Sequence, residues 1–286
     1  MVEDESVGME ELTIERLTRG EVLTAATFGR EQAMAIVGLY YWIQKARVAA
    51  STKVSAHNRR VDVLSDSALV VRLKQDLHKI ERQAARGLKA YAESQQLGRW
   101  AMSNIGIGPV ITAGLLAHID IARAPTAGAI WRFAGLDPTC KWNRGEKRPY
   151  NAALKRLCWL LGDCLKKASS HPWCFYGHLY LRRKEQEVAR DLQGVNADLA
   201  EQRLDEARKK GYGISPEQKA IWQSGHLQAV GLDRRAMRYA VKIFLSHYHW
   251  VGRTLLTGKA PEPWVIAHGG HIDWIPPHNW PMVGEE

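Results

Sequence analysis

The most constraining feature of this sequence is a row of apolar residues that recurs every three or four positions between residues 65 and 94. The row comprises Leu73, Leu77, Ile80, Ala84, Leu88 and Tyr91, with charged residues between them. An α-helix has 3.6 residues per turn, so this spacing predicts a long helix with one apolar stripe. Such a stripe, about three heptads long, suits an antiparallel helix pair within the chain or a seam between two chains.

Helical patterns also cover most of the remaining chain, so we expect a mainly α fold. The expected helices span residues 25–50, 65–94, 152–169, 179–192, 197–210, 216–223 and 234–256. Ser215 marks the start of one of them, because serine caps a first turn and Pro216 fits the first helical position. After Gly258 the prolines exclude a regular helix or a central strand. We therefore expect an irregular tail of Pro, Trp and His residues that packs through its aromatic rings.

Positive charge is concentrated in one part of the chain. Lysine and arginine outnumber the acids by 40 to 30, but residues 1–20 carry a net charge of −4. Residues 144–190 contain eleven bases and four acids, a net charge of +7. The tryptophans in or near this stretch are Trp131, Trp142, Trp159 and Trp173. Bases interleaved with aromatic rings are typical of nucleic-acid-binding surfaces, although a solvated helix face has a similar composition.

The sequence contains no stretch that is apolar enough for a membrane span. The longest apolar stretches lie near residues 111–117 and 241–245, far short of the roughly 20 residues that a bilayer requires. Three of the first five residues are acidic, which is unlike a secretory leader. We therefore expect a cytoplasmic protein without a membrane partner.

The segment over residues 104–117, NIGIGPVITAGLLA, has the pattern of a helix-hairpin-helix motif. Gly106 and Gly108 permit a tight turn between two short helices, because neither residue carries a Cβ atom. Pro109 fits the first turn of the second helix, where its missing N–H does no harm. The free N–H groups at such a helix start suit a phosphate oxygen, and an ordinary packing loop between helices is the alternative.

Three stretches give the chain a resemblance to a known family. They are residues 105–110, residues 134–138 after the Trp-Arg-Phe of 131–133, and the basic Leu-Lys-Arg-Leu of 154–157. A weaker similarity covers residues 234–236 and continues into residues 241–245. Between about residues 105 and 167 the chain resembles the C-terminal helix-hairpin-helix domain of bacterial insertion-sequence transposases of the Piv / RuvC-like DEDD class. These recombinases are guided by a bridge RNA, so the resemblance implies DNA binding, DNA recombination and transposition of a mobile element.

The chain departs from this family at both catalytic sites that the resemblance implies. The family has an N-terminal RuvC-like domain with four metal-binding carboxylates, whereas residues 1–98 here are expected to be helical. The family also uses a serine nucleophile just before a glycine. This chain has Asn143 near that place, and an amide cannot form a phospho-enzyme bond. Thr139 and Cys140 remain as candidate nucleophiles, but we expect a catalytically silent protein without cofactors.

The expected interface combines the hairpin with the basic residues that follow it. Its predicted members are Gly106, Ile107, Gly108, Val110, Lys141, Arg144, Lys147, Arg148, Lys155, Arg156, Arg182 and Arg183. Such residues hold phosphates and carry no base-sequence information. The expected partner is double-stranded DNA, with a structured RNA as the alternative. The long helix is expected to pair two chains in a homodimer or to dock a protein partner.

Histidines and cysteines raise the question of a metal site. The histidines of the last forty residues are His247, His249, His268, His271 and His278, and the cysteines are Cys140, Cys158, Cys164 and Cys174. His268 and His271 have a spacing that suits zinc, but hydrogen-bonded histidines in an aromatic tail are the preferred interpretation, so we expect no metal. The cysteines lack the C-x-x-C spacing of zinc ribbons, and we expect buried thiols.

Four segments are predicted along the chain. They are an acidic, flexible N-terminus (1–24), a coiled-coil-like helical pair (25–98), a transposase-like helix-hairpin-helix domain (99–192) and a helical extension with the irregular tail (193–286).

The sequence leaves two alternatives to nucleic-acid binding as the function. One is an active recombinase of unusual architecture that receives its metal site in trans. The other is a helical protein–protein interaction module or phage structural module.

Overall fold

The computed structural model describes residues 14–58, 68–140, 142–143, 145–211, 213–267 and 274–282. Within these ranges every regular element is an α-helix and no β-strand occurs, which confirms the predicted mainly α fold. The chain divides into two compact units, Met1–Ser94 and Gln95–Glu286. None of the described helices combines the length and the apolar character that a membrane crossing requires.

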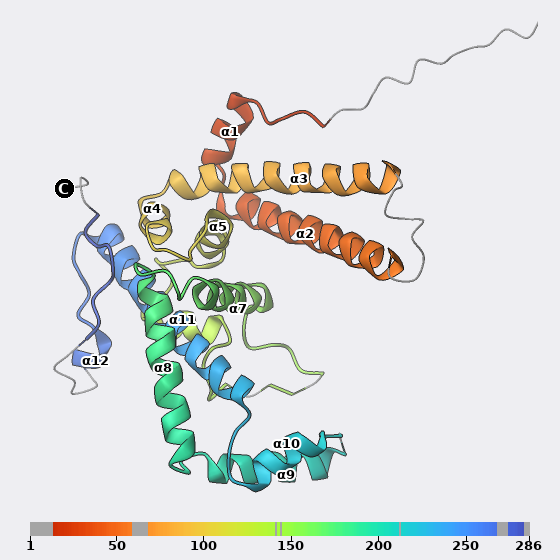
Figure 1. Ribbon diagram of the computed structural model, residues 1–286. Helices are drawn as coiled ribbons and strands as arrows, with labels where there is room; N and C mark the ends of the chain where they lie inside the picture. The colour runs from red at the N-terminus through yellow and green to blue at the C-terminus, as the bar shows by residue number, and fades with distance from the viewer. Residues whose placement is uncertain are drawn as a thin grey trace, which may run out of the picture. The chain divides into compact units, whose positions relative to one another are not determined.

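The first unit consists of α1 (Arg19–Ala26), α2 (Arg30–Asn58) and α3 (Ala68–Glu93). Helices α2 and α3 lie side by side and antiparallel (Figure 1), so a helix pair forms within one chain. A buried carboxylate joins them: Glu81 is 7% exposed and accepts hydrogen bonds from Gln44 Nε2 at 3.1 Å and from Arg47 Nε. A buried charge is tolerated only with such partners, so Glu81 selects the register of the pair.

The apolar stripe of α3 is covered over only part of its length. Near its C-terminal end Leu88 and Tyr91 are buried, and α1 packs there with Ala25 beside Gly87. Nearer its N-terminal end Leu73 is 54% exposed, and Ile80 is 39% exposed. The pairing of α2 with α3 therefore leaves part of the predicted stripe open to solvent.

Helix α1 begins inside the N-terminal segment that was predicted to be flexible. Its cap is reciprocal, because Thr18 Oγ1 accepts from the Glu21 N–H at 3.2 Å and the Glu21 carboxylate accepts from the Thr18 N–H at 2.7 Å. This capping box satisfies two backbone donors at the helix start. Residues 19–24 are thus helical, whereas residues 1–13 lie outside the described part of the chain.

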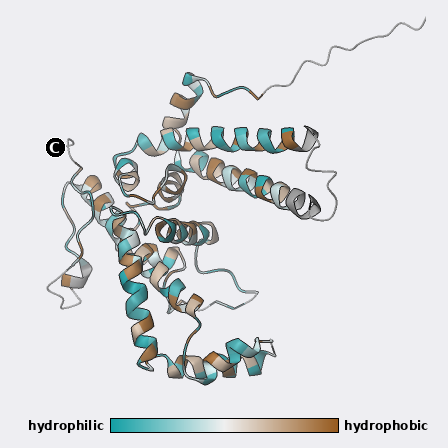
Figure 2. Cartoon of the chain, viewed as in Figure 1, coloured by the Kyte–Doolittle hydropathy of each residue, from teal (hydrophilic) through white to brown (hydrophobic). Residues whose placement is uncertain are grey.

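The second unit is built around α11 (Ala229–Thr257). Its other helices are α4 (Gln96–Met102), α5 (Pro109–His118), α6 (Ala127–Phe133), α7 (Ala152–Lys167), α8 (Phe175–Leu192), α9 (Ala197–Lys210), α10 (Pro216–Gln223) and α12 (Trp264–Ala267). Helix α11 packs against α4, α6, α7 and α8 (Figure 1). Hydrophilic and hydrophobic residues are interspersed along the helices of this unit (Figure 2). Residues 99–192 and 193–286, predicted as separate segments, share one unit because α11 supplies the core against which the earlier helices pack.

Aromatic side chains fill the centre of the second unit. Trp100 of α4 is fully buried and stacks on Phe244 of α11, with ring centroids 5.7 Å apart and an interplanar angle of 1°. Tyr176 of α8 meets Phe244 edge-on at 5.2 Å. Aromatic pairs of this kind add to the free energy gained from burial. The cluster therefore fixes α4 and α8 to the middle of α11.

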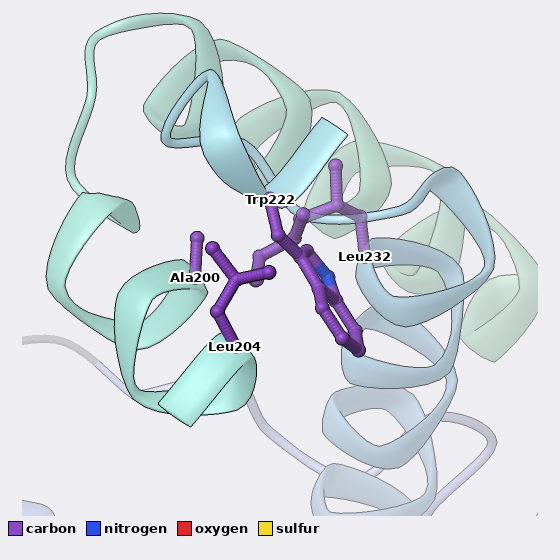
Figure 3. Packing of buried hydrophobic residues seen from close by; sticks show 5 residues of the cluster. Ala200, Leu204, Trp222 and Leu232 are labelled. Carbon is purple, nitrogen blue, oxygen red and sulfur yellow. The ribbon is translucent and has the colours of Figure 1, made fainter. Parts of the chain in front are cut away.

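A smaller apolar cluster joins α9, α10 and the start of α11. Trp222 of α10 is 6% exposed and packs with Ala200 and Leu204 of α9 and with Leu232 of α11 (Figure 3). Arg203 of α9 lies 6.0 Å above the Trp222 ring. This packing places a cation of α9 beside the N-terminal end of α11.

The tail after Gly258 packs through aromatic rings, as its composition predicts. Trp274 lies against Trp250 of α11 with ring centroids 5.6 Å apart, and His278 stacks on Phe175 of α8 at 4.6 Å and 14°. The short helix α12 interrupts the otherwise irregular tail. The described part of the tail is therefore docked on the second unit.

Candidate nucleic-acid interface

The turn between α4 and α5 has the tight geometry that its glycines predict. Gly106 has a φ of +93°, a backbone conformation that other L-residues rarely adopt. A Cβ atom on Gly106 would lie 3.3 Å from Ala168 Cβ and from Leu165 Cδ2, so the turn packs closely on the C-terminal end of α7. Ile107 is 4% exposed and anchors the turn in the core.

The N-terminal end of α5 presents backbone donors. Gly108 is the N-cap residue and has no side-chain oxygen to accept from the first turn, and Pro109 has no N–H. The N–H groups of Val110 and Ile111 therefore have no acceptor within the helix. Gly108 is exposed, and nothing lies within 4 Å of a Cβ atom built on it. An external anion can reach this end of α5.

Residues of the C-terminal tail form hydrogen bonds that support this hairpin. Asn104 is buried; its Nδ2 donates to the Trp100 carbonyl at 2.8 Å, and its Oδ1 lies 3.2 Å from His278 Nδ1. Asn279 Nδ2 donates to the Ser103 carbonyl at 2.9 Å. Because these bonds fix the turn from two sides, the hairpin is preorganised before any ligand arrives.

A backbone hydrogen bond links the two ends of the loop that connects α6 to α7. The Asn151 N–H donates to the Phe133 carbonyl at 2.8 Å, which joins the two ends of the loop. Gly135, with a φ of +65°, lies against the Tyr150 ring, and Lys155 Nζ lies 4.1 Å from the centroid of that ring. The loop therefore holds Lys155 beside the Gly-Leu-Asp-Pro stretch.

Helix α11 carries a row of three cations at intervals of four residues, Arg234, Arg238 and Lys242, called the α11 row below. Side chains at this spacing lie on one helix face and here span about 12 Å. Arg234 and Arg238 are exposed, and neither forms an ion pair with any residue that the structure describes. Lys242 Nζ lies 4.1 Å from the centroid of the Trp131 ring of α6. The row thus presents positive charge that the protein itself leaves largely unneutralised.

Burial and neighbouring positive charges shift the pKa values of Arg238 and Lys242 in the α11 row. Partial desolvation lowers the pKa of Arg238, although the residue as a whole remains exposed; three neighbouring arginines of α9 and α11 lower it further, and Glu187 opposes this shift. Burial also lowers the pKa of Lys242; Asp137 opposes this shift and Arg238 adds to it. A lowered pKa means that the surroundings disfavour the charged form, so a bound anion stabilises these side chains.

The structure places the predicted interface residues at separate points of the second unit. The hairpin residues Gly106 to Val110 pack on one end of α7, whereas Lys155 and Arg156 lie near the other end, about 15 Å away along the helix axis. Lys147 and Arg148 lie in the loop, and the Arg148 guanidinium lies 5.3 Å from the centroid of the Trp142 ring. Arg182 and Arg183 lie on α8, and Lys141 and Arg144 fall outside the described residues.

The candidate nucleophiles Thr139 and Cys140 lie in the exposed loop. The Thr139 hydroxyl donates to Asp137 Oδ1 at 2.7 Å, and the Thr139 N–H donates to the same oxygen at 2.9 Å. These hydrogen bonds lower the pKa of Asp137, with smaller contributions from Arg132 and Lys242. A carboxylate held in its ionised form is a weak base, and the arrangement is that of a local turn.

Sequence reasoning missed the α11 row as a binding surface. Its residues belong to the stretch that was noted only as the weakest part of the family resemblance. The signal that was available is the Arg-x-x-x-Arg-x-x-x-Lys spacing over residues 234–242 within a predicted helix. What the spacing could not reveal is that no described carboxylate pairs with Arg234 or Arg238.

The described histidines of the C-terminal part are hydrogen-bonded within the core. The Ile275 carbonyl accepts from His247 Nε2 at 2.7 Å, so His247 Nδ1 accepts from the Tyr176 hydroxyl at 2.8 Å in the neutral ring. Burial lowers the pKa of His247 to about 4. His249 Nε2 donates to the Ala124 carbonyl at 3.0 Å. No described group of histidines, cysteines and acids has metal-binding geometry, and His268 and His271 lie outside the described residues.

The cysteines are free thiols that differ in burial. Cys158 and Cys174 are buried, as expected, whereas Cys140 and Cys164 are only half-buried. Burial raises the pKa of Cys158 to about 12, so this thiol is inert at neutral pH. Cys174 Sγ donates to the Ile105 carbonyl at 3.2 Å, which adds one more contact to the hairpin turn.

No protein-family model, curated protein or solved structure matches this chain.

Proposed function

We propose that this chain binds nucleic acid, double-stranded DNA in the first place, through its backbone phosphates and without a catalytic step of its own. The observation that carries the proposal is the α11 row, where Arg234 and Arg238 are exposed, lie one turn apart and lack an ion-pair partner among the described residues. A polyanion with regularly spaced charges suits such a row better than a single small anion does.

The hairpin supplies a second group of phosphate-binding atoms. The uncapped N–H groups at the start of α5 are rigidly held, and Lys155 and Lys242, the last cation of the α11 row, lie beside the loop at the other end of α7. The separation of about 15 Å along α7 is shorter than one helical turn of B-DNA, which is about 34 Å. One duplex is thus long enough to contact both places. Contacts of this kind position a duplex and do not read its bases.

Salt dependence tests this proposal. The three cations of the α11 row alone predict a slope of about −3 for log affinity against log salt, which is about a 25-fold loss of affinity between 50 and 150 mM salt. Fluorescence anisotropy with a labelled 20-base-pair duplex measures this slope. An affinity that does not change with salt contradicts the proposal, and strand cleavage in the presence of magnesium contradicts the absence of catalysis.

A protein–protein interaction module is the second candidate, and α2 is the observation that favours it. This helix buries one apolar face in its own unit, where Val37 is 4% exposed and Ile43 is 3% exposed. Its opposite face is also apolar, with Leu39 at 47% and Trp42 at 67% exposure. A helix that is apolar on both faces normally has neighbours on both.

A second copy of the chain fits this outer face of α2. Nothing lies within 4 Å of a Cβ atom built on Gly38, so the space above it is open. In an antiparallel pairing, Trp42 of each copy fills the space above Gly38 of the other, and Ala35 and Ala49 allow the helices to approach. The same register brings Glu31 within one turn of Lys45 of the second copy, so the charges are complementary.

Light scattering coupled to size exclusion tests this dimer. The wild-type chain is expected at twice its mass of 32.2 kDa, and Trp42→Glu is expected at the monomer mass because it buries an unpaired carboxylate in the seam. Trp159→Glu, which changes a tryptophan of α7 that is 57% exposed, is the matched control and should remain dimeric. A monomeric wild type, or a dimeric Trp42→Glu variant, contradicts the pairing.

A further inference from the structure

A groove of about 360 Å³ opens between α8, α11 and the tail of the second unit. Its walls include Phe175, Arg182 and Gln186 of α8, Tyr239 of α11 and Trp274 of the tail. The phosphate contacts proposed above use none of the aromatic rings of this groove. Pockets of this size, with an apolar lining and a few polar groups, are typical of small-ligand sites.

The aromatic walls of the groove are held in place from behind. Trp274 is half-buried; it contacts Trp250 at 5.6 Å between centroids and meets His247 edge-on at 6.3 Å. Phe175 stacks on His278 at 4.6 Å. Since both rings are fixed by their own packing, a ligand that enters the groove does not have to order them.

The polar groups of the groove carry positive charge and unused hydrogen-bonding atoms. Arg183 pairs with Glu187 at 2.5 Å and lies 5.1 Å from the centroid of the Tyr239 ring, but its Nε is buried without a hydrogen-bond partner. Arg182 and Gln186 are exposed, and neither forms an ion pair or hydrogen bond with a described residue. The groove thus offers the Arg182 guanidinium and the Gln186 amide beside its aromatic rings.

We infer that this groove receives one unpaired base of a bound nucleic-acid strand, with an adjacent phosphate on Arg182. This inference rests on the proposed function, because the strand is held elsewhere by the α11 row and the hairpin. A nucleobase is planar and stacks on aromatic rings, its edge exchanges hydrogen bonds with an amide such as that of Gln186, and its phosphate pairs with arginine. An acidic peptide would use the arginines but would leave the aromatic walls without a planar partner.

The test compares two duplexes that differ by one base. Both carry a single extra nucleotide as a bulge; in one the extra nucleotide has its base, and in the other it is abasic. The wild-type chain is expected to bind the duplex with the base about tenfold more tightly. Gln186→Trp fills the groove from an exposed position and should reduce this ratio to about one. Trp274→Ala should do the same, while the affinity for a perfect duplex changes by less than about twofold.

Val188→Trp is the matched control, because Val188 is 40% exposed on the same helix and does not line the groove. This variant should keep the tenfold ratio, and circular dichroism checks that all variants remain folded. A wild-type ratio near one, with strong binding to the perfect duplex, overturns the groove assignment alone. A wild-type chain that binds no duplex at all overturns the proposed function, so the two failures are distinguishable.

Discussion

Replacing Arg234 and Arg238 together by glutamate is expected to weaken the binding of duplex DNA by at least about a hundredfold at 100 mM salt. Each arginine loses a charge-assisted hydrogen bond to phosphate, worth about 1.5 to 3 kcal/mol, and each new carboxylate repels the duplex. Both side chains are exposed and have no ion pair with a described residue, so the substitutions should leave the fold intact. Fluorescence anisotropy at several salt concentrations measures the affinity, and the slope against salt should fall by about two.

The matched control for this variant makes the same change of net charge elsewhere. Lys209→Glu combined with Lys219→Glu alters exposed lysines of α9 and α10 and shifts the net charge of the chain by the same amount. This control should lose no more than about threefold in affinity, because long-range charge is screened at this salt concentration. An equal loss in both double variants would mean that binding follows net charge and that the α11 row has no special role.

The helices that the sequence predicted best are those with local start and stop signals. The helices over residues 197–210 and 216–223 have the predicted bounds. Ser215 caps α10 by accepting from the Gln218 N–H at 3.2 Å, and α9 ends at Gly211, which has a φ of +65°. Capping chemistry depends on a few neighbouring residues, so sequence alone contains it.

The support of the hairpin could not be predicted from sequence. The turn depends on His278 beside Asn104 and on the bond from Asn279 to Ser103, pairs that are separated by 174 and 176 positions. Periodicity and capping describe only near neighbours, and long-range pairs are fixed by packing. The composition of the proline-rich tail predicted that the tail packs on the rest of the protein. It could not predict that the tail contacts the hairpin.

Counting charges along the sequence identified the basic stretch but did not show which of its bases are neutralised. Lys166 and Lys184 both pair with Asp233, at 2.7 and 3.6 Å, and Asp233 lies outside residues 144–190. Lys167 pairs with Asp163 at 2.6 Å. An ion pair within the protein offsets charge that a phosphate would otherwise attract, so unpaired cations matter more than the number of cations. Only the packed structure shows that Arg234 and Arg238 of the α11 row have no ion pair with a described residue.

Gly106→Ala is expected to lower the free energy of unfolding of the second unit by about 2 to 3 kcal/mol. The φ of +93° at this position costs a residue with a Cβ atom about 1 to 2 kcal/mol. The new methyl group would also press on Ala168 and Leu165 at 3.3 Å, in a core that has little room to relax. Urea unfolding followed by tryptophan fluorescence measures the loss, because Trp100 lies in the core beside this turn.

Gly108→Ala is the matched control for the hairpin, since its φ of −87° suits alanine and nothing lies within 4 Å of the added Cβ atom. Its free energy of unfolding should change by no more than about 0.5 kcal/mol. The same methyl group would stand where a phosphate approaches the N–H groups of α5, so duplex affinity should fall about fivefold, the loss of roughly one weak hydrogen bond. If Gly108→Ala lowers stability as much as Gly106→Ala, the turn does not have the described conformation. If it leaves affinity unchanged, the hairpin takes no part in binding and the α11 row acts without it.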